Sequence, residues 1–170
     1  MADPQSSPAF RQAVQITVDR FEGGGAVTVD DGGITKWGIA QRYHKGVDVA
    51  TLTRERAEAI YKAEYWDPLR CDEMPGGIGF LVFDMAVNPG NAVDLLQAEL
   101  RVERDGVVGP DTLDACRRFP AVDLISGLTQ RRLLHYIDET QRHPYKLKWL
   151  HGWLRRSAAG AAFAGRIACI

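Results

Sequence analysis

The chain has 170 residues, 45% hydrophobic and 25% charged, which is the composition of a globular protein with one well-formed core. Its formal net charge of −1 excludes the broad positive field with which many proteins hold nucleic acid. Any polyanionic partner would therefore have to be bound locally. We expect a single domain and no nucleic-acid partner.

The first ten residues, MADPQSSPAF, contain no basic region followed by an apolar stretch, and no later run is long enough to span a bilayer. We therefore expect a protein made in the cytoplasm without an export signal, and no stable insertion into a membrane. Cys71, Cys116 and Cys169 are far apart and lack the spacing of a zinc site or a disulfide framework, so they are expected to be reduced thiols in the core.

The first predicted helix begins at Ser7 and Pro8, which suit the N-cap and the first turn. Apolar residues recur at near-helical spacing until the glycines at 23–25 end the pattern, so Glu22 is predicted at the C-terminal end of this helix. Residues 25–34 alternate β-branched side chains and then turn residues. This pattern favours a short β-hairpin or an irregular β excursion.

Two further helices are predicted to begin at threonines. Thr35 is expected to cap a helix that carries Trp37, and Thr53 is expected to cap an amphipathic helix that closes near Asp67 and Pro68. Both predictions rest on the preference of threonine for the N-cap position.

A central buried helix is predicted over residues 78–87, IGFLVFDMAV, because this stretch is apolar on every side apart from Asp84. A carboxylate there needs a partner, and a buried hydrogen bond that stabilises the domain is favoured over a catalytic role. Asn91 is expected to cap the next helix. The chain is therefore predicted to be mainly α, with later helices beginning near Pro110 and over residues 120–140.

The most informative stretch is FEGGGAVTVDDGGITKWGIA, residues 21–40. A glutamate at the end of a helix faces the negative pole of the helix dipole, and shielding by apolar neighbours would further disfavour its ionised form. Glu22 would then suit a general acid that protonates a leaving-group oxygen, paired with a second, ionised carboxylate. Asp30 and Asp31 lie on the glycine-rich excursion and suit that second role. Taken separately, each feature is more often only a solvated helix end or a turn.

Several blocks resemble the phage and prophage N-acetylmuramidase family of glycoside hydrolases. The signature pieces are EGG at 22–24, DDGG at 30–33 and TKWGI at 35–39. The similarity continues through YKAEYWDPLRCDEMP at 61–75, FDMAVNPG at 83–90, LLQAEL at 95–100, DGVVGPDTL at 105–113 and GWLRR at 152–156. These blocks cover nearly the whole chain in the family's order.

This resemblance implies hydrolysis of the β-1,4 bond between N-acetylmuramic acid and N-acetylglucosamine in peptidoglycan, on a lysozyme-like helical domain. It places the catalytic proton donor at Glu22, and the water-holding groups at Asp30 or Asp31 and at Thr35. It also implies one domain over residues 1–170, with the catalytic motif at 22–39 and a peptidoglycan-binding region over about 91–170. The loop after Glu22 is shorter than in the family and lacks an aromatic residue, which leaves open which aspartate acts.

Other residues are candidates for binding the glycan. Trp37 and Tyr61 are the aromatic side chains expected to face a sugar, although core packing is the commoner role for each. Asn88 could hydrogen-bond an acetamido group. Arg155 and Arg156 could meet a muropeptide carboxylate, or lie on a solvated surface. The four histidines show no pairing suited to a metal, and neither a metal nor a cofactor is expected.

Two other functions remain open. A lytic transglycosylase would use one glutamate and no water-holding aspartate, and a non-catalytic wall-binding or phage structural module would keep the fold without turnover. In each case the partner is the peptidoglycan glycan strand, and a monomer is expected. Without an export signal, reaching the periplasmic or extracellular wall would require a holin, a secretion apparatus or a phage-like particle.

Overall fold

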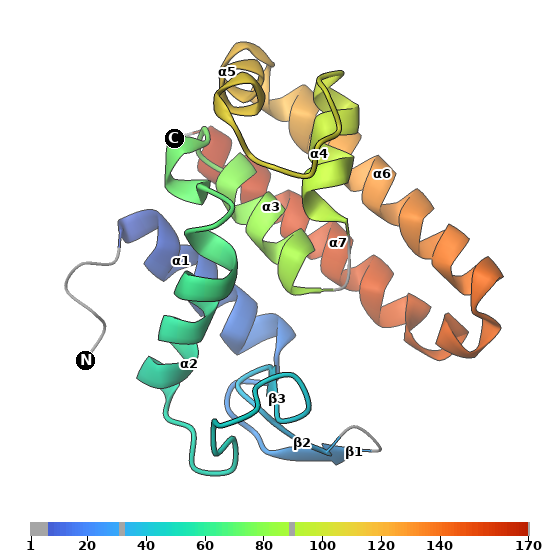
Figure 1. Cartoon of the computed structure of the whole chain (residues 1–170). Helices are drawn as coiled ribbons and strands as arrows, with labels where there is room; N and C mark the ends of the chain where they lie inside the picture. The colour runs from blue at the N-terminus through green and yellow to red at the C-terminus, as the bar shows by residue number, and fades with distance from the viewer. Residues whose placement is uncertain (1–6, 31–32, 89–90, 170) are drawn as a thin grey trace. The chain divides into compact units, whose positions relative to one another are not determined.

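The computed structural model describes residues 7–30, 33–88 and 91–169, and it divides into two compact units, Met1–Trp66 and Asp67–Ile170. Each unit contains helices, and a small antiparallel sheet belongs to the first unit (Figure 1). The prediction of a mainly helical, lysozyme-like chain with a short β excursion is confirmed. No helix in the described ranges combines the length and the apolar character needed to cross a membrane.

The first unit begins with helix α1, Pro8–Ile16. Its N-cap is Ser7, as the sequence predicts, because the Ser7 hydroxyl accepts a hydrogen bond from the Phe10 amide at 3.0 Å. The helix continues as a π-helical turn, η1, Thr17–Phe21. Glu22 follows directly, so its predicted position at the end of the first helix is confirmed.

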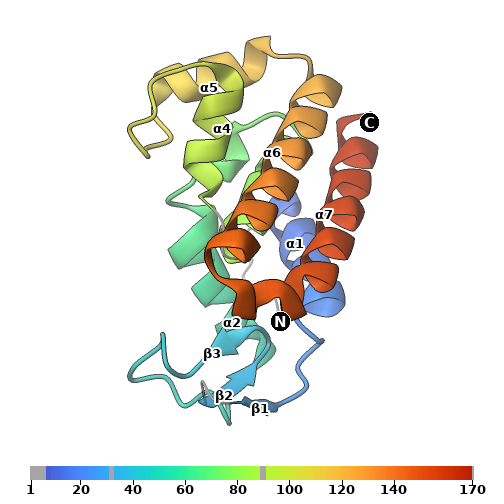
Figure 2. The same cartoon turned by 90° about the vertical axis from the view of Figure 1, so that its right-hand side faces the viewer.

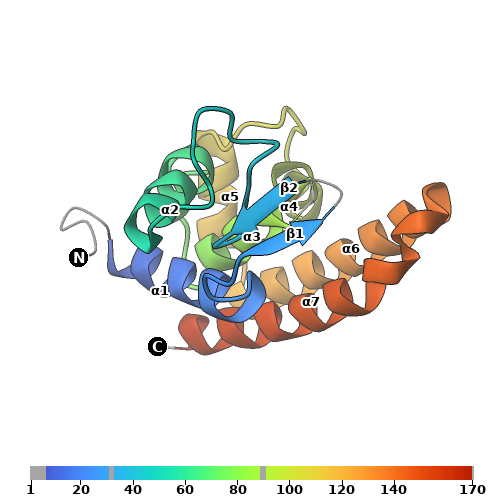
Figure 3. The same ribbon diagram turned by 90° about the horizontal axis from the view of Figure 1, so that it is seen from below.

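Three short strands form an antiparallel meander in the order β1, β2, β3. Their bounds are Thr28–Asp30, Gly33–Lys36 and Ile39–Ala40. In the register, Thr28 faces Thr35, and Thr35 in turn faces Ala40. Figure 3 shows strands β1 and β2 side by side. The predicted β excursion is confirmed, and it extends beyond residue 34 to Ala40.

The predicted helix capped by Thr35 is wrong, because Thr35 lies inside strand β2. The physical reason is the turn that follows. Trp37 and Gly38 both have positive φ angles, 54° and 76°, and a right-handed helix cannot pass through two such residues. The β-branched pair Ile34 and Thr35 then favours the strand.

Helix α2, Arg54–Tyr61, begins where the sequence predicts. The Thr53 hydroxyl caps it by accepting a hydrogen bond from the Arg56 amide at 3.3 Å. A second π-helical turn, η2, Lys62–Trp66, extends the helix. The buried rings of Phe10 and Trp66 pack edge to face with centroids 5.4 Å apart, which ties the first helix to this turn.

The described residues of the second unit form helices and connecting loops, with no strand. Its elements are η3 Cys71–Glu73, α3 Ile78–Val87, α4 Ala92–Leu100, α5 Pro110–Arg118, α6 Ala121–Arg142, η4 Pro144–Lys146 and α7 Leu147–Ala168. Residues 78–85 of α3 are all buried, which confirms the predicted central helix. The long helices α6 and α7 lie side by side and are joined by the short η4 turn (Figure 2).

Asp84 joins three helices of the second unit. Its carboxylate is fully buried and accepts hydrogen bonds from Arg132 of α6 at 2.7 Å and from Arg156 of α7 at 3.0 Å. The predicted buried hydrogen bond of Asp84 is therefore present. Arg156 is consequently part of the core network, not of a solvated surface.

Two other local expectations need correction. Asn91 occupies the N-cap position of α4, but its side chain makes no capping hydrogen bond. Cys71 and Cys116 are buried as expected, whereas Cys169 is exposed near the end of α7. All three cysteines are free thiols.

Candidate active site

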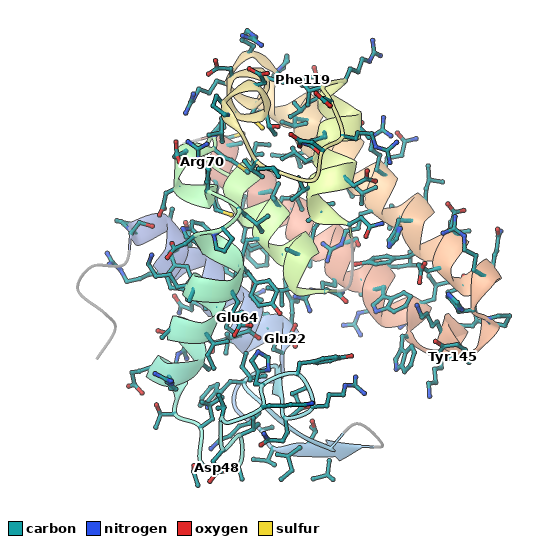
Figure 4. All side chains as sticks on the ribbon, viewed as in Figure 1. Glu22, Asp48, Glu64, Arg70, Phe119 and Tyr145 are labelled. Carbon is teal, nitrogen blue, oxygen red and sulfur yellow. The ribbon has the colours of Figure 1, made fainter. Side chains whose placement is uncertain are left out.

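Glu22 is placed by the π-helical turn that precedes it. Its amide donates to the Thr17 carbonyl at 3.0 Å, one residue further back than in an α-helix, and this closes the helix. The side chain is half-buried at the negative end of the helix, next to the small sheet (Figure 4). Single π-helical turns of this kind occur frequently at functional sites.

The turn between β2 and β3 is unusual. It has two residues, Trp37 and Gly38, and both have the positive φ angles that define a type I′ hairpin turn. Asparagine or glycine is the usual first residue of this turn, because a bulky side chain at positive φ is strained by about 1–3 kcal/mol. Trp37 at φ 54° is therefore held in place by other contacts.

Three contacts hold Trp37. Its carbonyl accepts a hydrogen bond from the Tyr61 hydroxyl at 2.9 Å, and its indole N–H donates to the Leu52 carbonyl at 3.1 Å. The indole ring also lies directly over Gly25, where an added Cβ atom would come within 2.4 Å of the ring. Any side chain at position 25 would overlap the Trp37 ring, so glycine is needed there. Two hydrogen bonds and this ring contact together stabilise the strained turn.

Gly38 brings the turn against Glu22. A Cβ atom at this position would lie 2.7 Å from Cγ of Glu22 and 2.2 Å from the Tyr61 hydroxyl oxygen. These distances show that the carboxylate-bearing side chain, the turn and the tyrosine pack at one point. Because Tyr61 also holds the Trp37 carbonyl, the position of Glu22 depends on this turn.

The pKa of Tyr65 reports the charge around the site. The ring centroid of Tyr65 is 6.0 Å from that of Tyr61. The pKa of Tyr65 is raised above its ordinary value, first by burial and then by the negative charges of Glu64 and Glu22. Two carboxylates therefore act on one phenol. Glu64 also pairs with His44 at 3.1 Å, and Figure 4 labels both glutamates.

The sequence-predicted residues are only partly brought together. Glu22, Trp37 and Tyr61 meet at the turn, and Thr35 lies in the adjoining strand β2. Asp30 ends strand β1, but its side chain lies outside the described residues, as does the whole of Asp31.

The predicted sugar contacts differ in how much of their side chains is exposed. Tyr61 is only 1% exposed, so its ring offers no face to a sugar, and its hydroxyl instead supports the turn. Asn88 is 7% exposed at the end of α3 and belongs to the second unit. Trp37 is half-buried and remains the aromatic candidate beside Glu22.

Sequence reasoning missed the pair of His44 and Glu64, which lie twenty residues apart. A sequence pattern shows no sign of such a contact, and Trp-Gly is not among the dipeptides that indicate a two-residue hairpin turn. A surface hollow of the first unit, lined by residues 46–48, 51–53 and Arg56, does not include Glu22. Among the described residues, no three histidine, cysteine or acidic side chains are grouped to hold a metal ion.

A mainly helical chain with a glutamate at a helix end beside a small antiparallel meander is typical of the lysozyme-like class of glycoside hydrolases. Residues 16–90 match the family described as "Glycosyl hydrolase 108", and residues 91–158 match a "Predicted Peptidoglycan domain". Residues 16–90 thus belong to the glycosyl hydrolase 108 family, and the peptidoglycan domain follows them directly. The chain is therefore a glycoside hydrolase that acts on peptidoglycan.

The fold is also similar to a solved structure. The structure of Brucella abortus SagA superposes with a TM-score of 0.77 and 26% sequence identity, over 93% of this chain and 96% of that one. No curated protein sequence matches the chain.

Proposed function

We propose that the protein cleaves the β-1,4 bond between N-acetylmuramic acid and N-acetylglucosamine, with Glu22 as the proton donor. One observation carries this assignment: the Glu22 side chain is half-buried and packed against Gly38, in a turn that is strained at Trp37. Strained backbone is retained where the surrounding structure stabilises it, and it occurs preferentially at functional sites. A carboxyl held in this way is pre-organised for proton transfer.

The proposed reaction is a single displacement. Glu22 donates its proton to the glycosidic oxygen while the bond from that oxygen to the anomeric carbon breaks. A water molecule attacks the opposite face of the sugar and gives up a proton to Asp30 or Asp31, and the Thr35 hydroxyl positions this water. An inverting mechanism of this kind needs carboxyl groups about 6.5–9.5 Å apart, and it inverts the anomeric configuration.

The assignment of Glu22 is tested by clearing of permeabilised Gram-negative cells. We expect Glu22→Gln to lower the rate by about 10²–10⁴-fold, the usual contribution of general acid catalysis, while the circular dichroism spectrum is unchanged. Glu64→Gln is the matched control, because it makes the same substitution at the neighbouring carboxylate that also acts on Tyr65. Full lysis by Glu22→Gln, or loss of lysis only in Glu64→Gln, would refute the assignment.

The products test the mechanism. Mass spectrometry of the released muropeptides should find reducing ends, whereas a lytic transglycosylase would leave 1,6-anhydro ends. Proton NMR of the first-formed anomer distinguishes inversion from retention. Asp30→Asn and Asp31→Asn, assayed separately, identify the residue that holds the water, since only one of them should abolish turnover.

We also propose that the chain acts as one domain and as a monomer. The support for one domain is that helix α3, which lies in the first family match, packs against α4 and α6 of the second match within one compact unit. One cooperative unfolding transition, with coincident fluorescence and circular dichroism curves, is the expected result. Access to the wall would be provided by a holin, a secretion apparatus or a phage-like particle, and lysis from outside only after permeabilisation would be consistent with this.

A further inference from the structure

A row of aromatic side chains leads from the core of the second unit to its surface at the α6–α7 connection. Tyr136 of α6 is buried and stacks on Trp153 of α7, with centroids 4.9 Å apart and an interplanar angle of 29°. Trp149 follows at 6.2 Å from Trp153 and 35° from parallel, and Tyr145 packs against Trp149 at 6.2 Å. We call Tyr136, Trp153, Trp149 and Tyr145 the aromatic row.

The inner half of the row is anchored. The Tyr136 hydroxyl accepts a hydrogen bond from Arg132 at 2.7 Å, and Arg132 in turn donates to the buried carboxylate of Asp84. The rings further along are therefore stacked on a fixed base. A pre-ordered aromatic surface loses little conformational entropy when it binds a ligand.

The outer half of the row is not explained by packing. Tyr145 is 65% exposed and Trp149 is 44% exposed, although both are large and partly apolar. Tyr136 and Trp153 stack between the two helices, whereas Tyr145 and Trp149 leave much of their surface in water. Adjacent exposed aromatic side chains of this kind mark interaction sites more often than chance would give. Figure 4 shows Tyr145 at the α6–α7 connection.

The segment that carries the outer half of the row is rich in cations. Residues 141–156 contain five lysines and arginines and no aspartate or glutamate, in a chain whose net charge is −1. Lys146 pairs with Glu139, and Arg156 pairs with Asp84. The Lys148 ammonium lies 4.6 Å from the centre of the Trp149 ring, so a cation adjoins the exposed aromatic surface.

From this geometry we propose that Tyr145, Trp149 and Lys148 form a binding platform for a peptidoglycan glycan strand, separate from the cleavage residues. The aromatic faces pack on the apolar faces of pyranose rings, and the cations attract the carboxylates of the lactyl groups and stem peptides. The platform lies within residues 91–158, which match the predicted peptidoglycan domain, whereas the loop at 105–113 has no comparable aromatic surface. This inference rests on the proposed function, because it takes the glycan strand of the wall as the polymer that is bound.

The test is binding to purified, insoluble peptidoglycan sacculi by co-sedimentation. The full chain is used with Glu22→Gln in the background, so that the polymer is not digested during the measurement. We expect Trp149→Leu and Tyr145→Ala each to weaken binding by about tenfold, because an exposed aromatic anchor is lost while the core is unchanged. Trp149→Phe should largely keep binding, since it retains an aromatic ring. Lys148→Gln should weaken binding less, and only at low salt.

Tyr43→Ala is the matched control. Tyr43 is 73% exposed and has the guanidinium of Arg42 4.7 Å from its ring centre, so it is also an exposed aromatic residue beside a cation. It lies in the first unit, and its loss should leave sacculus binding unchanged. Thermal melting of every variant verifies that a change in binding is not a change in folding.

Three outcomes would overturn the platform. Binding of Trp149→Leu equal to that of Trp149→Phe would mean that the aromatic face is not used. Equal losses in Tyr43→Ala would mean that the effect is not local. A concentration-dependent dimer that disappears in Trp149→Leu would identify the surface as a contact between copies of the chain. Failure of the proposed function would instead appear as unchanged lysis in Glu22→Gln, because sacculus binding is measured without turnover.

Discussion

Substituting Gly38 by alanine tests whether the turn positions Glu22, the proposed proton donor. Gly38 has φ +76°, so an alanine there is strained by about 1–2 kcal/mol. The new Cβ would also lie 2.2 Å from the Tyr61 hydroxyl oxygen and 2.7 Å from Cγ of Glu22. Relieving these overlaps costs about 1–3 kcal/mol more, and the total loss of folding free energy is about 2–5 kcal/mol.

The activity loss should exceed what reduced stability explains. To make room for a Cβ atom, the Glu22 side chain has to move, and a displacement of about 1 Å at a reacting group can lower turnover about 10²-fold. The assay is kcat on soluble muropeptide fragments, at a temperature where the variant is fully folded. Urea unfolding of the same samples gives the stability change.

Gly46→Ala is the matched control for the backbone strain. Gly46 has φ +93°, but no atom lies within 4 Å of an added Cβ. The Gly46→Ala variant should lose only about 1–2 kcal/mol of folding free energy, from backbone strain, and keep the wild-type kcat. Equal stability and equal kcat in Gly38→Ala and Gly46→Ala would refute the argument that the turn packs on Glu22.

Three further outcomes are expected. Asp84→Ala should lower the unfolding free energy by about 3–5 kcal/mol in urea titration, because it leaves the buried Arg132 and the largely buried Arg156 without their carboxylate. In the native protein at pH 8 a thiol reagent should modify only Cys169, since burial raises the pKa of the Cys116 thiol to about 11 and that of the other buried thiol still further. A hydrogen bond from Gln97 lowers the pKa of Asp105 below its ordinary 3.8, so this carboxylate contributes stability above about pH 4 and loses it as the pH falls through its native pKa. An NMR titration of Asp105 with a midpoint at or above 3.8 would contradict this assignment.

Local patterns were sufficient to predict most helices. Ser7 caps the first helix, Thr53 caps α2, and the apolar stretch of α3 is buried, because N-caps and uniform apolarity are properties of neighbouring residues. The two π-helical turns escaped prediction, since they differ from an α-helix only in one hydrogen-bond step. The partners of Asp84 also could not be predicted, because Arg132 and Arg156 lie 48 and 72 residues further along the chain.

The site was predictable in its residue types but not in its construction. Glu22 lies at the end of the first helix, where the apolar pattern predicts it, and the family resemblance indicates the same residue. The roles of Tyr61 and Gly38 depend on a turn that propensity alone argues against, since tryptophan rarely adopts a positive φ. At Thr35 the local sequence favours the N-cap of a helix. The residue lies in strand β2 because of the turn that follows it.

The choice of tryptophan at position 37 shows what this part of the chain is organised to do. Asparagine would form the same type I′ turn with less strain, but it would lose the hydrogen bond to the Leu52 carbonyl and the ring that covers Gly25. The strain at Trp37 is therefore offset by contacts that asparagine could not make. Sites where a local preference is violated and then offset by several specific contacts are those where function imposes the geometry. Here the contacts converge on Gly38 and on the Glu22 side chain packed against it, which is why this carboxyl is the one assigned to proton transfer.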